Sequence, residues 1–86
     1  SDVHLGDWGI GNRVWVYDNE PRNPQIVDKI GRTIDSGDSV VIFPKHIKQK
    51  DLNDMVLAGH DVQSLVESNV YQGLEAKLKF TQWKKV

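Results

Sequence analysis

The stretch RVWVYDNEPRNPQIVDKIGRTIDSGDSVVIF, from Arg13 to Phe43, decides the expected fold. Its first part, Arg13–Tyr17, is rich in β-branched and aromatic residues without polar alternation, which is typical of a strand buried on both faces of a sheet. Asn23 then supplies a helix N-cap and Pro24 a first-turn proline, followed by apolar residues at helical spacing. The segment Ser39–Phe43 is again continuously apolar. A strand, a helix and a second strand in this order predict a βαβ unit with parallel strands.

The segments outside this unit carry weaker signals. Residues 1–12 hold three of the seven glycines and show no periodicity, so we expect them to be irregular. Asp51 and Asp61 are suited to cap two short helices. The predicted fold class is α/β, with a βαβ unit and short parallel sheet followed by two or three carboxyl-terminal helices. The expected organisation is an irregular segment, the βαβ-containing part and a helical extension packed on it, over residues 1–12, 13–60 and 61–86.

The carboxyl-terminal segment YQGLEAKLKFTQWKKV fits both a strand and a helix. Its apolar residues alternate as in a strand, yet Leu74 and Leu78 are also spaced as on one face of a helix. Glu75 and Lys79 form a favourable pair four residues apart. We therefore predict a helix for this segment, and the helical pattern is clearest as far as Phe80.

Size and composition limit the class of protein. The chain has 86 residues, 38% of them apolar and 27% charged, as expected for one small globular domain. The net charge of −1 provides no overall attraction for nucleic acid. The absence of cysteine excludes disulfides and thiolate zinc sites and fits an intracellular protein. Neither a signal peptide nor an apolar run of about 20 residues is present, so no membrane association is expected.

Two groups of carboxylates follow the predicted strands. Asp18 and Glu20 come directly after the first strand, and residues two apart on an extended chain point the same way. Asp51 and Asp54 follow the second strand. In parallel α/β sheets ligands bind beyond the carboxyl ends of the strands, and Mg²⁺ takes one or two protein carboxylates with waters and phosphates. The pattern indicates a metal site, whereas a polar loop and a helix cap are the commoner explanations of either group alone.

Taken together, these motifs resemble a known family. The segments RVWVYDNEPRNP, KDLNDM and YQGLEAKLKF are similar to the carboxyl-terminal sequence of the DNA primases of T-even-type bacteriophages, over about Arg13–Val86. Their order also resembles the second half of a Toprim (topoisomerase–primase) domain. The resemblance implies a nucleotidyltransferase of DNA replication that makes short RNA primers on single-stranded DNA. Its cofactor would be Mg²⁺ or Mn²⁺, and its partners nucleoside triphosphates and a replicative helicase in a primosome, in the cytoplasm of the infected bacterium.

The resemblance also assigns residues. Asp18, Glu20 and Asp51 match the acidic positions that hold the metal and act in catalysis, and Asn53 and Asp54 complete the second motif. Basic residues near these motifs or in the tail are candidates for phosphate or nucleic-acid binding: Arg22, Lys50, Lys77, Lys79, Lys84 and Lys85.

The chain departs from the Toprim pattern in ways that leave alternatives open. It has no E-G motif on an earlier strand, and without cysteine it holds neither the zinc module of such primases nor any zinc. We therefore expect a carboxyl-terminal primase fragment, inactive alone, with half of the metal site. One alternative is a non-catalytic module that docks the helicase or single-stranded DNA through its last two helices and basic tail. Basic residues interleaved with Phe80 and Trp83 could follow a single strand. Another is a fragment of a Toprim-like nuclease or topoisomerase, and a solvated basic helix is the commoner explanation of the tail.

Overall fold

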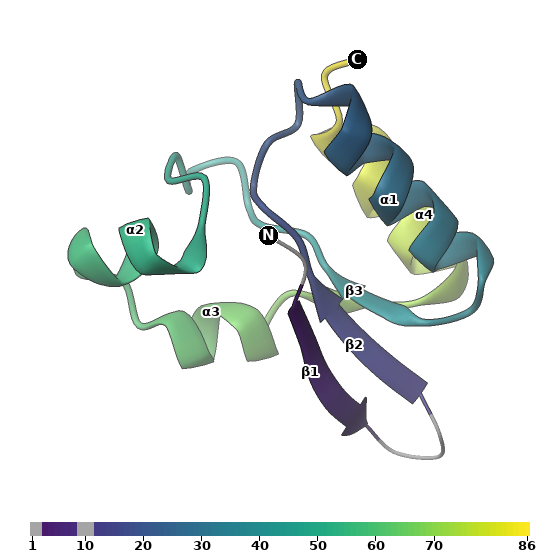
Figure 1. Cartoon of the computed structure of the whole chain (residues 1–86), viewed down its shortest axis with the longest axis horizontal. Helices are drawn as coiled ribbons and strands as arrows, with labels where there is room; N and C mark the ends of the chain where they lie inside the picture. The colour runs from purple at the N-terminus through teal and green to yellow at the C-terminus, as the bar shows by residue number, and fades with distance from the viewer. Residues whose placement is uncertain (1–2, 9–11) are drawn as a thin grey trace.

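A four-stranded mixed sheet organises the computed structural model, which describes residues 3–8 and 12–86. The strands lie in the order β1-β2-β3-β4, and β2 and β3 are parallel as predicted. The outer strands β1 and β4 run antiparallel to their neighbours (Figure 1). The strand bounds are Val3–Trp8 for β1, Asn12–Val16 for β2, Ser39–Val41 for β3 and Val70–Tyr71 for β4.

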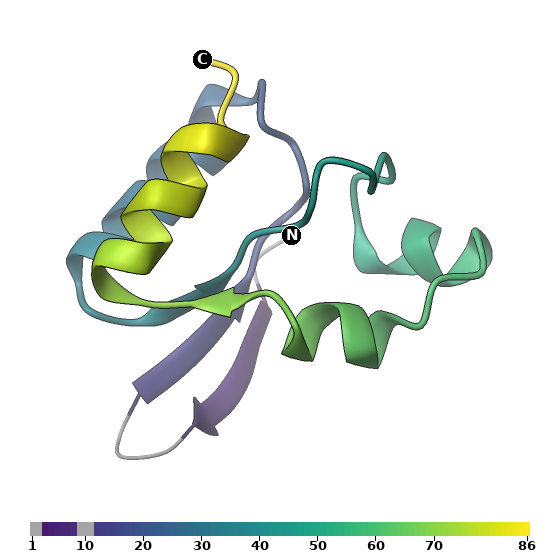
Figure 2. The ribbon, with the colours of Figure 1, turned by 180° about the vertical axis from the view of Figure 1, so that it is seen from behind.

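Four helices complete the α/β fold in the described part of the chain: α1 (Pro24–Asp35), α2 (Leu52–Leu57), α3 (Val62–Glu67) and α4 (Gly73–Trp83). Helices α1 and α4 lie side by side against the sheet, and α2 and α3 lie together away from them (Figures 1 and 2). Within residues 3–8 and 12–86, no helix is both long enough and apolar enough to cross a membrane.

The helices begin where the capping residues of the sequence predict. The side chains of Asn23, Asp51 and Asp61 accept hydrogen bonds from main-chain N–H groups in the first turns of α1, α2 and α3, at 3.0, 2.8 and 3.2 Å. These bonds satisfy donors that a helix start otherwise leaves unpaired. Gly37 follows α1 with φ of +89°, a left-handed conformation that favours glycine and ends the helix.

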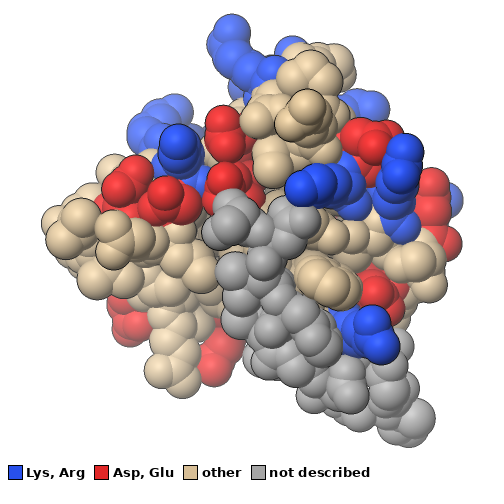
Figure 3. Space-filling view, viewed as in Figure 1, with Lys and Arg blue, Asp and Glu red and all other residues tan. Residues whose placement is uncertain are grey.

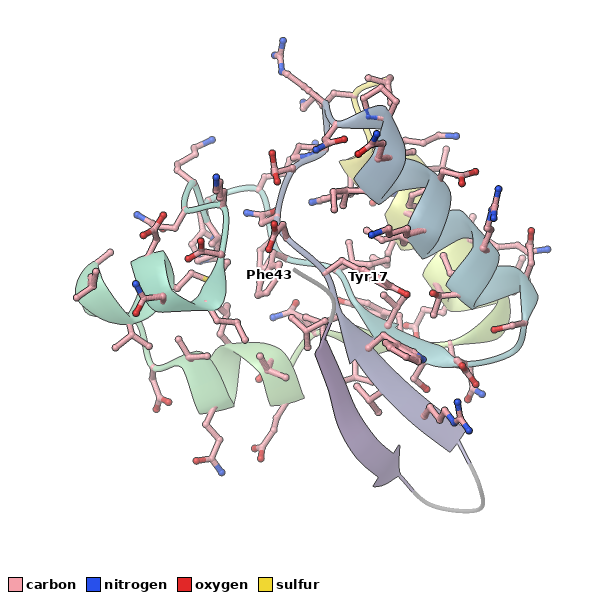
Figure 4. All side chains as sticks on the ribbon, viewed as in Figure 1. Tyr17 and Phe43 are labelled. Atoms are coloured by element: carbon pink, nitrogen blue, oxygen red, sulfur yellow. The ribbon has the colours of Figure 1, made fainter. Side chains whose placement is uncertain are left out.

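Apolar side chains form one cluster on each face of the sheet, because successive strand residues point to opposite sides. Figure 4 labels one member of each, with Tyr17 on the side of α1 and Phe43 on the side of α2. The cluster under α1 and α4 contains Tyr17, Ile26, Ile30, Ile34, Val40, Ile42, Ala76 and Trp83. The other contains Val14, Val16, Val41, Phe43, Ile47, Met55 and Val66. Burial on both faces, expected from the unbroken apolar strands, is confirmed.

The structure corrects the sequence-based prediction at both outer strands. The expectation of an irregular segment over residues 1–12 was wrong for Val3–Trp8, which forms β1; residues 1, 2 and 9–11 lie outside the described part. The two-residue strand β4 was not predicted, and it pairs with β3 through Val40–Tyr71 and Val41–Val70. Strand pairing of this kind depends on a distant partner, which local periodicity does not reveal.

Candidate functional site

The two acidic motifs of the sequence lie on adjacent loops. The main-chain N–H of Asn19, in the loop between β2 and α1, donates a hydrogen bond of 2.5 Å to the carbonyl of Lys50. Asp18 and Glu20 flank Asn19, and Asp51 follows Lys50. This bond therefore brings the main chains of all three predicted metal ligands into one region, beyond the carboxyl ends of the parallel strands.

The side chain of Asn19 holds this arrangement in place. It is only 9% exposed, and its Nδ2 donates to the carbonyls of Ile47 and Gln49, both at 3.0 Å. Its Oδ1 accepts a hydrogen bond of 2.9 Å from Nε1 of Trp83, at the end of α4. One amide thus connects the loop after β2, the loop after β3 and the last helix.

Sequence reasoning missed this role of Asn19. The sequence analysis gave Asn19 no role, although a polar residue directly after a buried strand needs hydrogen-bond partners if it is buried itself. The same bond settles the role of Trp83, which is 8% exposed. Trp83 is a packing residue, and its ring is not available as the base-stacking surface considered for the tail.

Further main-chain hydrogen bonds fix the loop that carries Asp18 and Glu20. The N–H of Asn23 donates to the carbonyl of Glu20 at 3.1 Å, which closes a turn just before α1. The N–H of Lys85 donates to the carbonyl of Pro21 at 2.8 Å. The segment that follows α4 therefore helps to hold the acidic loop in place. The side chains of Asp18 and Glu20 remain partly exposed.

The second motif, KDLND, starts α2. Asp51 is partly buried and caps the helix, since its Oδ1 accepts the N–H of Asp54 at 2.8 Å. Asn53 and Asp54 lie exposed in the first turn of the helix. The capping explanation of this motif is therefore confirmed, and a metal-binding role for Asp51 would have to be shared with the cap.

The side chains do not form a complete metal-binding group. Within the described residues, no cluster of three or more histidine, aspartate or glutamate side chains is arranged to hold a metal ion. Figure 3 shows acidic side chains gathered on the face that carries α2 and the loop after β2, with basic side chains nearby. The assignment of Asp18, Glu20 and Asp51 as metal ligands remains a prediction.

The predicted basic residues are spread over more than one face. Arg22 and Lys50 are exposed in the two acidic loops. On α4, Nζ of Lys79 lies 5.4 Å from the centroid of the Tyr71 ring. Nζ of Lys84, just after the helix, lies 5.2 Å from the centroid of the Phe80 ring, which packs against α1. Lys79 and Lys84 therefore lie against different aromatic rings.

No protein-family model matches the chain. Its sequence is similar to a protein of the DNA primase class. That relative is the DNA primase of Enterobacteria phage T4, which is 34% identical over 79 residues. The similarity covers 86% of this chain, and the chain spans 23% of the length of the phage protein. The resemblance to phage DNA primases that the sequence motifs indicate is confirmed.

Proposed function

We propose that this chain is part of the catalytic, Toprim-type domain of a phage DNA primase. Such an enzyme would make short RNA primers from nucleoside triphosphates on single-stranded DNA, in the cytoplasm of an infected bacterium. The observation that carries the proposal is the hydrogen bond from Asn19 to Lys50, which places the DNE and KDLND motifs side by side. The sequence similarity to the T4 primase supports the same class of activity.

The ligands offered by the two loops suit magnesium or manganese. Asp18, Glu20 and Asp51 provide only carboxylate oxygens, which hard divalent cations prefer. Mg²⁺ commonly takes one or two protein carboxylates and fills its other positions with water and phosphate, so an incomplete protein ligand set is compatible with it. The metal would neutralise triphosphate charge and favour ionisation of the primer 3′-hydroxyl. The residues of this chain would hold the cation and, through the Asn19 connections, fix the spacing of its ligands.

Metal binding can be tested on the chain as it stands. We expect Mn²⁺ to broaden amide NMR signals around Asp18, Glu20 and Asp51 before those of any other acidic region. Glu20→Gln should weaken this response, whereas Glu75→Gln, at an exposed position on α4, should leave it unchanged. Broadening centred elsewhere, or an equal response in both variants, would contradict the proposed site.

Catalysis requires a second test in a longer primase that contains this sequence. Asparagine caps helices about as well as aspartate, so Asp51→Asn should preserve α2 while removing the negative charge. If Asp51 binds the metal, the variant should lose priming activity without losing stability. Full priming activity in the stable variant would reduce Asp51 to its capping role.

The exposed apolar side chains on α4 favour a second candidate function, a non-catalytic docking module. Leu74 and Leu78 are 73% and 58% exposed and lie one turn apart. A partner such as a replicative helicase would cover them. Replacing both with glutamine should abolish helicase association but leave priming by the isolated primase intact if α4 is a docking surface. Unchanged association would exclude this use of α4.

A further inference from the structure

The residues that line two adjoining hollows form a groove between α4 and the segment that follows β3. Figure 2 shows these two elements from the side on which α4 lies in front of α1. The groove consists of hollows of about 240 and 250 Å³, which share the lining residues Pro44, Lys45, Gln82 and Trp83. We call this the α4 groove. One end reaches Asn19 and Pro21 of the acidic loop, and the other reaches Asn69 and Tyr71.

The α4 groove is lined by positive charge. Lys48 and Lys85 line the hollow next to the acidic loop, Lys79 lines the other hollow, and Lys45 lines both. None of the residues lining the two hollows is aspartate or glutamate. The net charge of the chain is −1, so any attraction for phosphate has to come from a local group of positive side chains. The lysines of the α4 groove form such a group.

The distribution of these lysines points to an elongated ligand. A compact anion would occupy one hollow and contact only part of the set, whereas successive phosphates of a strand would meet lysines in both. The three aromatic rings in the groove are already engaged, since Phe43 and Trp83 are buried and the ring of Tyr71 faces Lys79. Contacts would therefore be made to phosphates rather than by base stacking.

We propose that the α4 groove binds the phosphate backbone of a single nucleic-acid strand and leads it to the loop of Asp18 and Glu20. The second part rests on the proposed primase function, because it assumes that the acidic loop is where nucleotides react. The first part does not, since it depends only on the groove and its lysines. Lys45 and Lys48 are new candidates, whereas Lys77 and Lys84 line neither hollow.

The arrangement of lysines provides a matched pair of variants. K45E/K48E reverses two charges in the groove, and K77E/K84E reverses two charges outside it, so both change the net charge equally. Binding of a fluorescein-labelled oligothymidylate of about 12 nucleotides would be followed by anisotropy at several salt concentrations. EDTA is present throughout, so the result does not depend on metal binding by the acidic loop.

Wild-type affinity should fall with salt with a slope of at most about 3, because each phosphate contact to a single strand contributes about 0.7. K45E/K48E should lower the slope by about 1.4 and weaken binding at least about tenfold near 50 mM salt. K77E/K84E should weaken it less than about threefold. Thermal unfolding checks that each variant folds, and K45Q/K48Q provides a milder replacement with a smaller loss in the same direction.

Three outcomes would overturn the proposal. The first is no binding by the wild-type chain even at low salt. The second is an equal loss in the two glutamate variants, which would mean that net charge and not the groove controls binding. The third is complete competition by inorganic triphosphate at concentrations where a competing unlabelled strand has no effect, which would assign the groove to a compact anion. A failed Mn²⁺ experiment with intact, groove-dependent DNA binding would reject the metal site alone.

Discussion

Replacing Asn19 with alanine tests the connection that holds the acidic loops together. The substitution removes three side-chain hydrogen bonds, of which those to Ile47 and Trp83 are buried and the one to Gln49 is partly buried. At about 1 kcal/mol net for each bond, the free energy of unfolding should fall by about 3 kcal/mol. A chain of this length has a total stability of roughly 4–13 kcal/mol, so the loss is a large fraction of it. The melting temperature should fall by about 12–24 °C.

The measurement is urea and thermal unfolding followed by circular dichroism. Trp83 emission is the local probe, recorded in a background in which Trp8 and Trp15 are replaced by phenylalanine, because the chain has three tryptophans. Asn53→Ala is the matched control, because it deletes the same amide at an exposed position and should change stability by less than about 0.5 kcal/mol. Asn19→Asp should destabilise at least as much as Asn19→Ala. It would turn a donor into a charged acceptor facing the carbonyls of Ile47 and Gln49.

The reasoning would be refuted if Asn19→Ala lowered the free energy of unfolding no more than Asn53→Ala does. It would also be refuted if Asn19→Asp were as stable as the wild type, because the donor role of Nδ2 would then be unimportant. A loss of stability without any shift of Trp83 emission would separate the loop contacts from the contact to α4.

Substitutions at three further positions test local features, each by urea unfolding. Asp51→Ala should lower the free energy of unfolding by about 1 kcal/mol, because alanine removes the helix cap. Asp51→Asn should leave it almost unchanged, and an equal loss in both variants would contradict the capping geometry. Gly37→Ala should cost roughly 1–2 kcal/mol, since φ is +89° there, and a neutral effect would mean that the turn relaxes. Trp83→Phe should lower the free energy of unfolding by about 2 kcal/mol, because Oδ1 of Asn19 loses its donor. A variant that loses fluorescence but keeps its stability would count against that bond.

Local sequence signals were sufficient for the central βαβ unit and for the starts of α1, α2 and α3. Asn23, Asp51 and Asp61 act on N–H groups two or three residues away, so their effect is readable from neighbouring positions. The parallel pair β2 and β3 followed from two unbroken apolar segments on either side of a helix. The adjacency of the acidic motifs also followed from the sequence, because parallel strands end at the same edge of a sheet.

The choice of buried face on α4 required the tertiary structure. Leu74 and Leu78 are four residues apart, and so are Ala76 and Phe80. Periodicity alone therefore does not decide which of the two pairs faces the core. Packing against α1 and the sheet buries Ala76 and half-buries Phe80, and it leaves the leucines exposed. That choice also decides which tail lysines line the α4 groove.

The roles of Asn19 and of β4 were likewise decided only by contacts between distant parts of the chain. Asn19 and Trp83 are 64 positions apart, and their hydrogen bond depends on the packing of α4 beside α1. The pairing of Val70 and Tyr71 with β3 needs an open sheet edge that other segments create. The sequence by itself determined the central βαβ unit, the starts of α1, α2 and α3 and the positions of the acids, because these depend on neighbouring residues. Tertiary packing decided which side chains connect the acidic loops and where a basic groove lies beside them, because those depend on which surfaces are buried together.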